Sequence, residues 1–137
     1  MHVELTEGER ELIRWARVAR LATIDPTGRP HVVAVSPVLD GDLILFATDE
    51  ESAKVRNLRS NARVALVVDE YSEDWNHGLR GVMIRGTARV LDHGPEWDRV
   101  RGLLYDKYLQ YEPLAPIHPG RSVIVRVEIE DVSDSGL

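Results

Sequence analysis

The sequence predicts a mainly β protein, an antiparallel β-barrel of about six strands with flanking helices, folded as a single domain over residues 1–137. Short runs rich in Val, Ile and Leu recur along the chain, and Gly, Pro and Asp residues separate them, which is typical of strands and turns. Only three segments show helical periodicity, so most consecutive strands lack a helical crossover and must pair antiparallel. A chain of 137 residues is long enough for one hydrophobic core.

The chain opens with a predicted helix and a β-hairpin. Thr6 and Glu9 fit a capping box, and apolar residues follow at helical spacing, so we expect a helix over residues 7–18. The next two runs, RLATI and HVVAVS, have strand composition. The segment DPTG at 25–28 joins them, and it predicts a turn because Pro presets φ at its second position and Gly relieves the fourth.

The middle of the chain adds two strands and a short helix. Residues 43–47 form a third apolar run, and a second capping-box pattern from Thr48 to Glu51 predicts a helix that ends near Leu58. Residues 62–68 are almost continuously apolar, so we expect a strand that is buried on both faces.

The last third combines two strands with a longer helix. Residues 82–91 predict a strand with a bulge at Gly86, and Pro95 opens a helix because proline is tolerated in a first turn. Side chains alternate over residues 122–129, and we expect this final strand to close the barrel. The helix carries an apolar stripe that should face the core, namely Trp97, Val100, Leu104 and Tyr108.

Composition argues against several classes of function. The formal net charge of -6 is unfavourable for a general nucleic-acid binder, because neutralising phosphates takes an excess of Lys and Arg. The chain has no cysteine, which excludes disulfides, thiolate metal sites and Cys nucleophiles. No apolar run approaches the ~20 residues of a membrane span, and the residues after Met1 are polar and acidic, so we expect a cytoplasmic protein that binds no membrane.

The common catalytic motifs are absent from the sequence. It contains no G-x-G-x-x-G, no phosphate-binding P-loop and no G-x-S-x-G, and the five histidines are scattered, so we expect no metal site. If the protein is an enzyme, a bound cofactor should therefore supply the chemistry.

Basic residues nevertheless gather in two places, which suits a small anionic ligand. One group repeats at helical spacing from the first helix onward, at Arg10, Arg14, Arg17 and Arg20, and its first three members form a stripe on that helix. The other follows the third strand and consists of Lys54, Arg56, Arg59 and Arg63. Lys and Arg beside a capped helix start provide the N–H donors and positive charge that phosphate binding needs.

Several segments resemble a known family in their order and spacing. They are A-R-L-A-T followed by G-R-P-H, then K-x-R-N-L-R-x-N, then V-D-x-Y with D-W after it. Over roughly residues 9–130 the chain resembles the pyridoxamine 5'-phosphate oxidase-like flavin and deazaflavin binders, which have a six-stranded, FMN-binding-like split β-barrel. It is most similar to their small F420-dependent oxidoreductases.

The resemblance implies a homodimer with a cofactor groove between the subunits. The ring of the cofactor would lie against the backbone of the first strands, at Arg20, Leu21, Ala22, Thr23, Val35, Ser36 and Pro37. Basic and amide side chains would hold its phosphate, with Lys54 and Arg56 first and then Asn57 and Arg59. Ser36 and Thr48 would donate hydrogen bonds to the ring or phosphate, and Trp75 would cover the ring.

The function that the resemblance implies is transfer of a hydride between coenzyme F420 and an electron-poor organic small molecule. The basic stripe on the first helix favours F420, because FMN has no long anionic tail. One alternative is an FMN-binding oxidoreductase of the same fold. Another is a non-catalytic binder of a flavin, a deazaflavin or haem. The last alternative gains support because relatives often end the final strand with tryptophans, whereas this chain ends EIEDVSDSGL.

Overall fold

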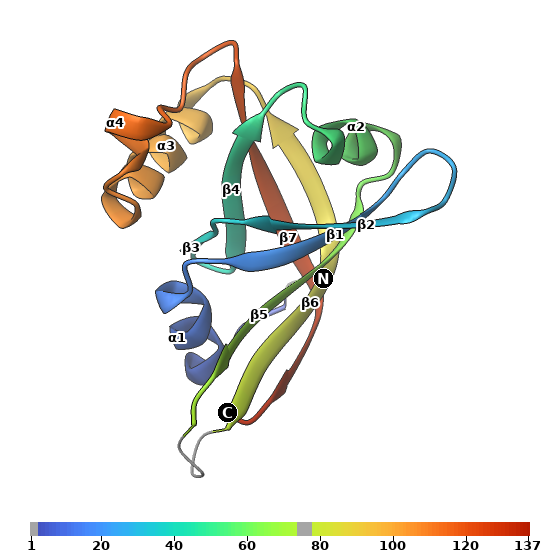
Figure 1. Cartoon of the computed structure of the whole chain (residues 1–137), viewed down its shortest axis with the longest axis vertical. Coiled ribbons are helices and arrows are strands. Elements are labelled where there is room, and N and C mark those ends of the chain that lie inside the picture. The colour runs from blue at the N-terminus through green and yellow to red at the C-terminus, as the bar shows by residue number, and fades with distance from the viewer. Residues whose placement is uncertain (1–2, 74–77) are drawn as a thin grey trace.

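The computed structural model describes residues 3–73 and 78–137, which form an antiparallel sheet of seven strands with flanking helices (Figure 1). The helices are α1 (Glu7–Trp15), α2 (Ala53–Ser60), α3 (Pro95–Lys107) and α4 (Tyr111–Leu114). The strands are β1 (Ala19–Ile24), β2 (Pro30–Val35), β3 (Val38–Asp40), β4 (Leu43–Asp49), β5 (Arg63–Tyr71), β6 (Leu79–Leu91) and β7 (Ser122–Ser135). The predicted fold class, mainly β with flanking helices, is confirmed. No helix within these residues is long and apolar enough to cross a membrane.

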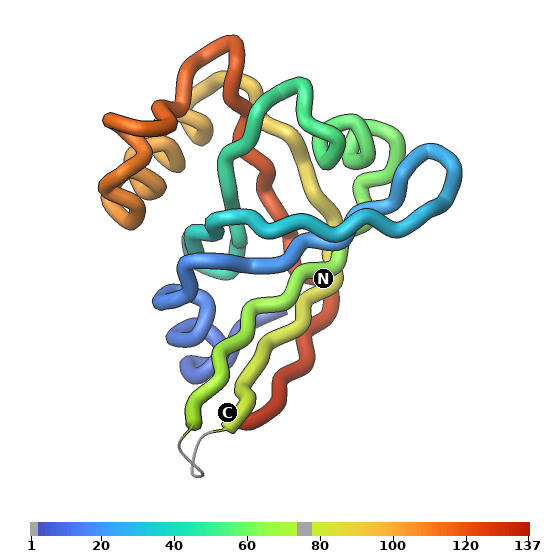
Figure 2. Tube along the Cα trace, in the orientation of Figure 1, coloured from blue at the N-terminus to red at the C-terminus, as the bar shows by residue number. Residues whose placement is uncertain are grey.

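The strand order is β2-β1-β5-β6-β7-β4-β3, and the hydrogen-bonded ladder does not close. The sheet has one strand more than the six predicted, because Val38–Asp40, directly after Pro37, forms the short strand β3 and pairs with β4 rather than with β1. Pro37 has no N–H to donate to a ladder, which favours a break at this point. The final strand was expected to close the barrel, but β7 lies inside the sheet between β6 and β4. Figure 2 shows β5, β6 and β7 running side by side as long strands.

Local chemistry explains most of the element boundaries. Thr6 caps α1 and Glu9 completes the capping box, as predicted, although the helix ends at Trp15 rather than at residue 18. The predicted cap at Thr48 is wrong, because β4 continues through it and Ser52 accepts the N-terminal hydrogen bond of α2 instead.

Two strands differ from the sequence prediction. The strand predicted over 62–68 is buried on one face only, since exposure alternates along β5 and residues such as Ala65 and Val67 face outward. The final strand extends beyond residue 129 to Ser135. The bulge predicted at Gly86 is confirmed by a register shift between β6 and β7 at Arg85/Gly86.

The helices cover some parts of the sheet and leave others open. Leu12 and Ile13 of α1 and Leu58 of α2 join the cluster on the inner face of the curved sheet. The predicted stripe of α3 is buried as expected and packs on the outer side of β3, β4 and β7 through residues that include Leu45 and Ile124.

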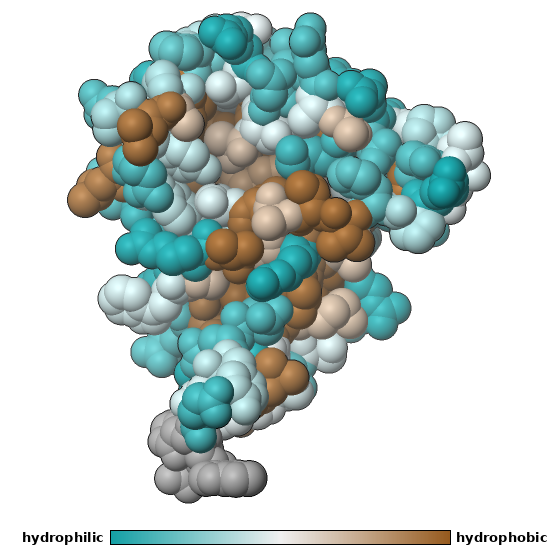
Figure 3. All heavy atoms as spheres, viewed as in Figure 1, coloured by the Kyte–Doolittle hydropathy of each residue, from teal (hydrophilic) through white to brown (hydrophobic). Residues whose placement is uncertain are grey.

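The outer face of β2, β1 and β5 carries apolar side chains that no described helix covers. Val32 is 65% exposed, and Ala34 beside it is also exposed. Ala22 and Val67 are partly exposed on the neighbouring strands, which pair with one another in register. The space-filling view shows apolar residues gathered where β1 and β2 cross the molecule (Figure 3).

Candidate functional site

The predicted phosphate-binding residues meet where β4 ends and α2 begins. The Lys54 ammonium donates a hydrogen bond to Thr48 Oγ1 at 2.8 Å, and the Thr48 hydroxyl lies 3.4 Å from Ser52 Oγ. Burial lowers the pKa of Lys54, and the charge of Asp49 partly offsets this shift. Within the described residues, no carboxylate lies within ion-pair distance of Lys54. The cluster therefore holds a partly desolvated positive charge beside two hydroxyls at a helix N-terminus.

The other predicted residues of α2 have different environments. Arg56 donates to the carbonyl of Glu51 at 2.6 Å, and Arg59 lies 3.8 Å from the carboxylate of Glu50. Both side chains are exposed and remain at the same end of the molecule as Lys54. Asn57 is buried.

Asn57 connects α2 to the hairpin. Its Nδ2 donates to Thr23 Oγ1 at 3.0 Å, and the two residues are only 5% and 1% exposed. A buried side-chain amide that satisfies a buried hydroxyl has a structural role, because either group alone would be costly to bury. Their side chains therefore fix α2 on β1, and only their backbone atoms remain candidates for a ligand.

The predicted hairpin residues separate into inward and outward sets. Leu21, Val35 and Pro37 are buried, so they offer a ligand their backbone rather than their side chains. Ala22 faces outward, and Arg20 is exposed with its guanidinium 3.4 Å from the carboxylate of Asp69.

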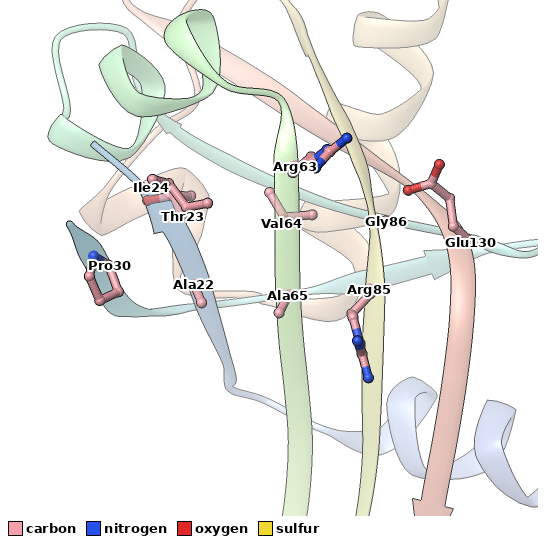
Figure 4. Close-up of a pocket in the computed structure, with 10 residues that line it drawn as sticks. All are labelled: Ala22, Thr23, Ile24, Pro30, Arg63, Val64, Ala65, Arg85, Gly86 and Glu130. Atoms are coloured by element: carbon pink, nitrogen blue, oxygen red, sulfur yellow. The ribbon is translucent and has the colours of Figure 1, made fainter. Parts of the chain in front are cut away.

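A hollow of about 380 Å³ opens on the outer side of β1, β5 and β6 (Figure 4). Its floor is apolar, and it is lined by Ala22, Thr23, Ile24, Pro30, Arg63, Val64, Ala65, Arg85, Gly86 and Glu130. The hollow exists because Ala22 and Ala65, which pair with one another on the outer face of β1 and β5, are small. Sequence reasoning named Ala22 and Thr23 as cofactor contacts, Arg63 as part of a basic group and Gly86 as a bulge. It did not bring these residues together, because the strand register that joins them is set by distant pairing.

Residues 5–136 match the family described as pyridoxamine 5'-phosphate oxidase. The chain belongs to this family.

Individual relatives agree with this membership. Over 93 residues, 65% of this chain, the protein is 38% identical to the 5a,11a-dehydrotetracycline/5a,11a-dehydrooxytetracycline reductase of Streptomyces rimosus, and the match spans 66% of that relative's length.

Three solved structures extend the similarity over nearly the whole chain. The conserved hypothetical protein Rv2991 of Mycobacterium tuberculosis is 26% identical with a TM-score of 0.81, covering 98% of this chain and 86% of that one. An F420 reductase is 25% identical with a TM-score of 0.73, covering 94% of this chain and 98% of that one. The haem storage protein HutZ of Vibrio cholerae is 18% identical with a TM-score of 0.77, covering 96% of this chain and 94% of that one, and this likeness shows the fold alone.

The remaining predicted features lie outside the Lys54 cluster. Trp75, predicted to cover the ring, is not among the described residues. The basic stripe of α1 is occupied by contacts within the chain: Arg10 pairs with Asp42, Arg14 lies 3.9 Å from Glu7, and Arg17 donates to the carbonyl of Lys107. The stripe therefore does not distinguish F420 from FMN.

A polar cluster that sequence reasoning missed surrounds the break between β2 and β3. The carbonyl of Pro37 accepts hydrogen bonds from Lys107 Nζ at 2.8 Å and from the Tyr108 hydroxyl at 2.5 Å. Burial raises the pKa of Tyr108 and of Tyr111, and the nearby hydroxyl of Ser36 partly offsets the shift at Tyr111. Burial, together with the charge of Arg17, lowers the pKa of Lys107 to about 8. These side chains attach α3 and α4 to the point where the sheet divides.

The lowered pKa of Lys107 predicts a pH-dependent stability. In the unfolded chain Lys107 keeps its proton up to its ordinary pKa of 10.5, whereas in the folded chain it loses the proton near its lowered pKa of about 8. Between these two pH values the unfolded state binds more protons, so the free energy of unfolding should rise with pH. Urea denaturation of the wild type and of Lys107→Met, below and within this window, measures the effect. We expect the wild type to gain stability relative to the variant as the pH rises, since Tyr108 and Tyr111 are common to both proteins. A constant difference would contradict the prediction.

Proposed function

We propose that this chain is an oxidoreductase that uses coenzyme F420 to transfer a hydride to an electron-poor organic small molecule. The observation that carries the proposal is the Lys54 cluster, in which an ammonium without a carboxylate partner among the described residues lies beside the hydroxyls of Thr48 and Ser52. Such a donor set fits the phosphate group of a flavin or deazaflavin cofactor, because charged donors bind phosphate oxygens more strongly than neutral ones.

The uncovered apolar face supports the same proposal. A planar ring system needs a flat apolar surface, and the outer face of the hairpin offers one at Ala22, Val32 and Ala34, next to the backbone of Arg20 and Ser36. Arg56 and Arg59 add positive charge near Lys54. When bound, reduced F420 supplies a hydride, and the residues of this chain would bind and orient the two reactants.

One relative favours F420 over FMN, and another supports oxidoreductase activity without indicating the cofactor. A solved F420 reductase is similar over 94% of this chain, and the similar Streptomyces protein is named a reductase. Both cofactors carry a phosphate, however, and the donors of the Lys54 cluster suit either one. An FMN-dependent enzyme therefore remains the second candidate, and a non-catalytic binder the third.

A binding titration separates the three candidates. Cofactor-free protein is titrated with F420, FMN and haem, and binding is followed by fluorescence or by haem absorbance. Tight F420 binding together with turnover of an artificial two-electron acceptor supports the proposal. Tighter binding of FMN than of F420 would indicate an FMN-dependent oxidoreductase. Binding without turnover would indicate a non-catalytic binder. Binding of none of the three would contradict every candidate.

The apolar face also supports a homodimer with the cofactor between its subunits. We propose that a second copy of the chain packs against the face around Val32, because burying a large exposed apolar patch is favourable. Val32→Glu should therefore convert a dimer to a monomer and weaken F420 binding, as measured by light scattering and titration. Leu109→Glu is the matched control, since Leu109 is 80% exposed but lies near α4. A dimer that survives Val32→Glu unchanged would place the interface elsewhere.

A further inference from the structure

The hollow on β1, β5 and β6 is shaped for a flat molecule. Figure 4 shows Ala22 and Ala65 at the same height on neighbouring strands, with Arg63 above them and Arg85 beside Ala65. Ala22 pairs with Ala65, and Ala65 pairs with Arg85, so these side chains share the outer face of the sheet. The floor has no large side chain, and Ile24 and Pro30 form its apolar edge on the hairpin side. The hollow therefore offers a broad apolar surface rather than a deep cavity.

Charged groups border this apolar floor on its far side. Arg63 is exposed and forms no ion pair with a described residue. Arg85 lies 3.5 Å from Asp131, but the two side chains are 66% and 59% exposed, and an ion pair of that kind is weak. Glu130, which the bulge opposite Gly86 leaves unpaired in the ladder, accepts a hydrogen bond from the Thr87 hydroxyl at 3.1 Å. Positive charge is thus least compensated beside Arg63.

From this arrangement we infer that the hollow binds the hydride acceptor, and that the acceptor is a flat conjugated organic molecule with an anionic oxygen directed at Arg63 and Arg85. The inference rests on the proposed function and specifies its substrate class. The apolar floor would pack against a flat carbon skeleton, and the two guanidinium groups would donate hydrogen bonds to a negatively charged oxygen. Ala22 belongs both to this floor and to the predicted cofactor strands, so the two reactants would border the same strand.

The arginines also suit the chemistry of a conjugated carbonyl acceptor. When a hydride adds to the C=C bond of an enone, the π electron pair moves onto the carbonyl oxygen, which becomes an enolate and later takes a proton from solvent. The hydride and its two electrons come from reduced F420, which is oxidised. A guanidinium beside that oxygen stabilises the charge as it develops.

Binding of two matched probes tests the inference without any cofactor. 2-Naphthoate is flat and anionic, and 2-naphthylmethanol has the same ring without the charge. We expect the wild type to prefer naphthoate, and Arg63→Met with Arg85→Met to weaken naphthoate about tenfold while leaving naphthylmethanol unchanged. Ala65→Leu should weaken both probes because it fills the floor. Arg89→Met is the control, an exposed arginine on the same strand outside the hollow.

Two results would overturn the inference. One is equal binding of the two probes to the wild type, or no binding of either. The other is an effect of Arg89→Met as large as that of the double variant. Titrating F420 in parallel separates this site from the proposed function. If F420 binds, and Lys54→Ala weakens that binding, but naphthoate binds the arginine variants as well as the wild type, the proposed function is supported and the acceptor site is wrong. If the arginine substitutions weaken naphthoate binding but F420 does not bind, the acceptor site is supported and the cofactor proposal is wrong.

Discussion

Replacing Lys54 by alanine is expected to weaken F420 binding by about 2 kcal/mol, or about thirtyfold in Kd. The ammonium is partly buried, and the hydroxyl of Thr48 holds it at 2.8 Å. Its charge is therefore fixed in place before a ligand arrives, and little side-chain entropy remains to be lost on binding. Fluorescence titration of both proteins with F420 measures the difference, and FMN serves as a second ligand.

Two controls connect the effect of Lys54→Ala to the phosphate. Arg89→Ala removes an exposed positive charge on β6 and should leave F420 binding unchanged. Lys54→Arg keeps the charge and should retain part of the affinity. Stability should not fall in Lys54→Ala, because burial already disfavours the charged ammonium in the folded state. Unchanged F420 affinity in a folded Lys54→Ala protein would show that the phosphate binds elsewhere.

The features that the sequence predicted well are those set by neighbouring residues. The capping box of Thr6 and Glu9 and the turn at 25–28 depend on contacts only a few positions apart, and both are present. The same holds for the start of α3 at Pro95 and for the bulge at Gly86. Fold class follows from such local signals, because they show that strands predominate and that few helical crossovers join them.

Features that depend on distant partners were predicted poorly. The run at 62–68 is apolar because one face packs on the core and the other forms an uncovered apolar surface. From the sequence alone, such a surface looks the same as a face buried under a second layer of structure. Thr48 has the composition of a helix cap, yet pairing with Val123 of β7 keeps it in a strand.

The residues of the candidate site were likewise predictable only where they lie close together in the sequence. Lys54 and Thr48 are six residues apart, so their contact was within reach of sequence reasoning. The hollow was not, because Ala22, Ala65 and Gly86 come together only through the register of three strands. No local pattern marks them, since small residues in strands are common.

Gly86→Ala is expected to lower the free energy of unfolding by about 3 kcal/mol, which corresponds to about 10 °C in Tm. A Cβ at this position would lie 2.1 Å from the carbonyl oxygen of Glu128, and both groups belong to backbone that paired strands hold in place. The contact can be relieved only by moving β7 away from β6, at the bulge that leaves Glu130 on the rim of the hollow. Thermal unfolding and naphthoate binding of the variant should therefore both be impaired.

The same substitution elsewhere in the chain should have a different effect, which makes the cause testable. Gly81 lies on β6 as well, but its Cβ would meet its nearest neighbour at 3.6 Å, an ordinary contact, so Gly81→Ala should leave Tm nearly unchanged. Gly102 lies within α3 with nothing near its Cβ, and Gly102→Ala should stabilise the protein by about 0.5–1 kcal/mol because alanine favours helix over glycine. If all three variants lost similar stability, the loss at Gly86 would not come from the close approach of β6 and β7. A loss of Tm confined to Gly86, together with weaker naphthoate binding by that variant, would show that the separation of these two strands sets both the stability of the sheet and the shape of the hollow.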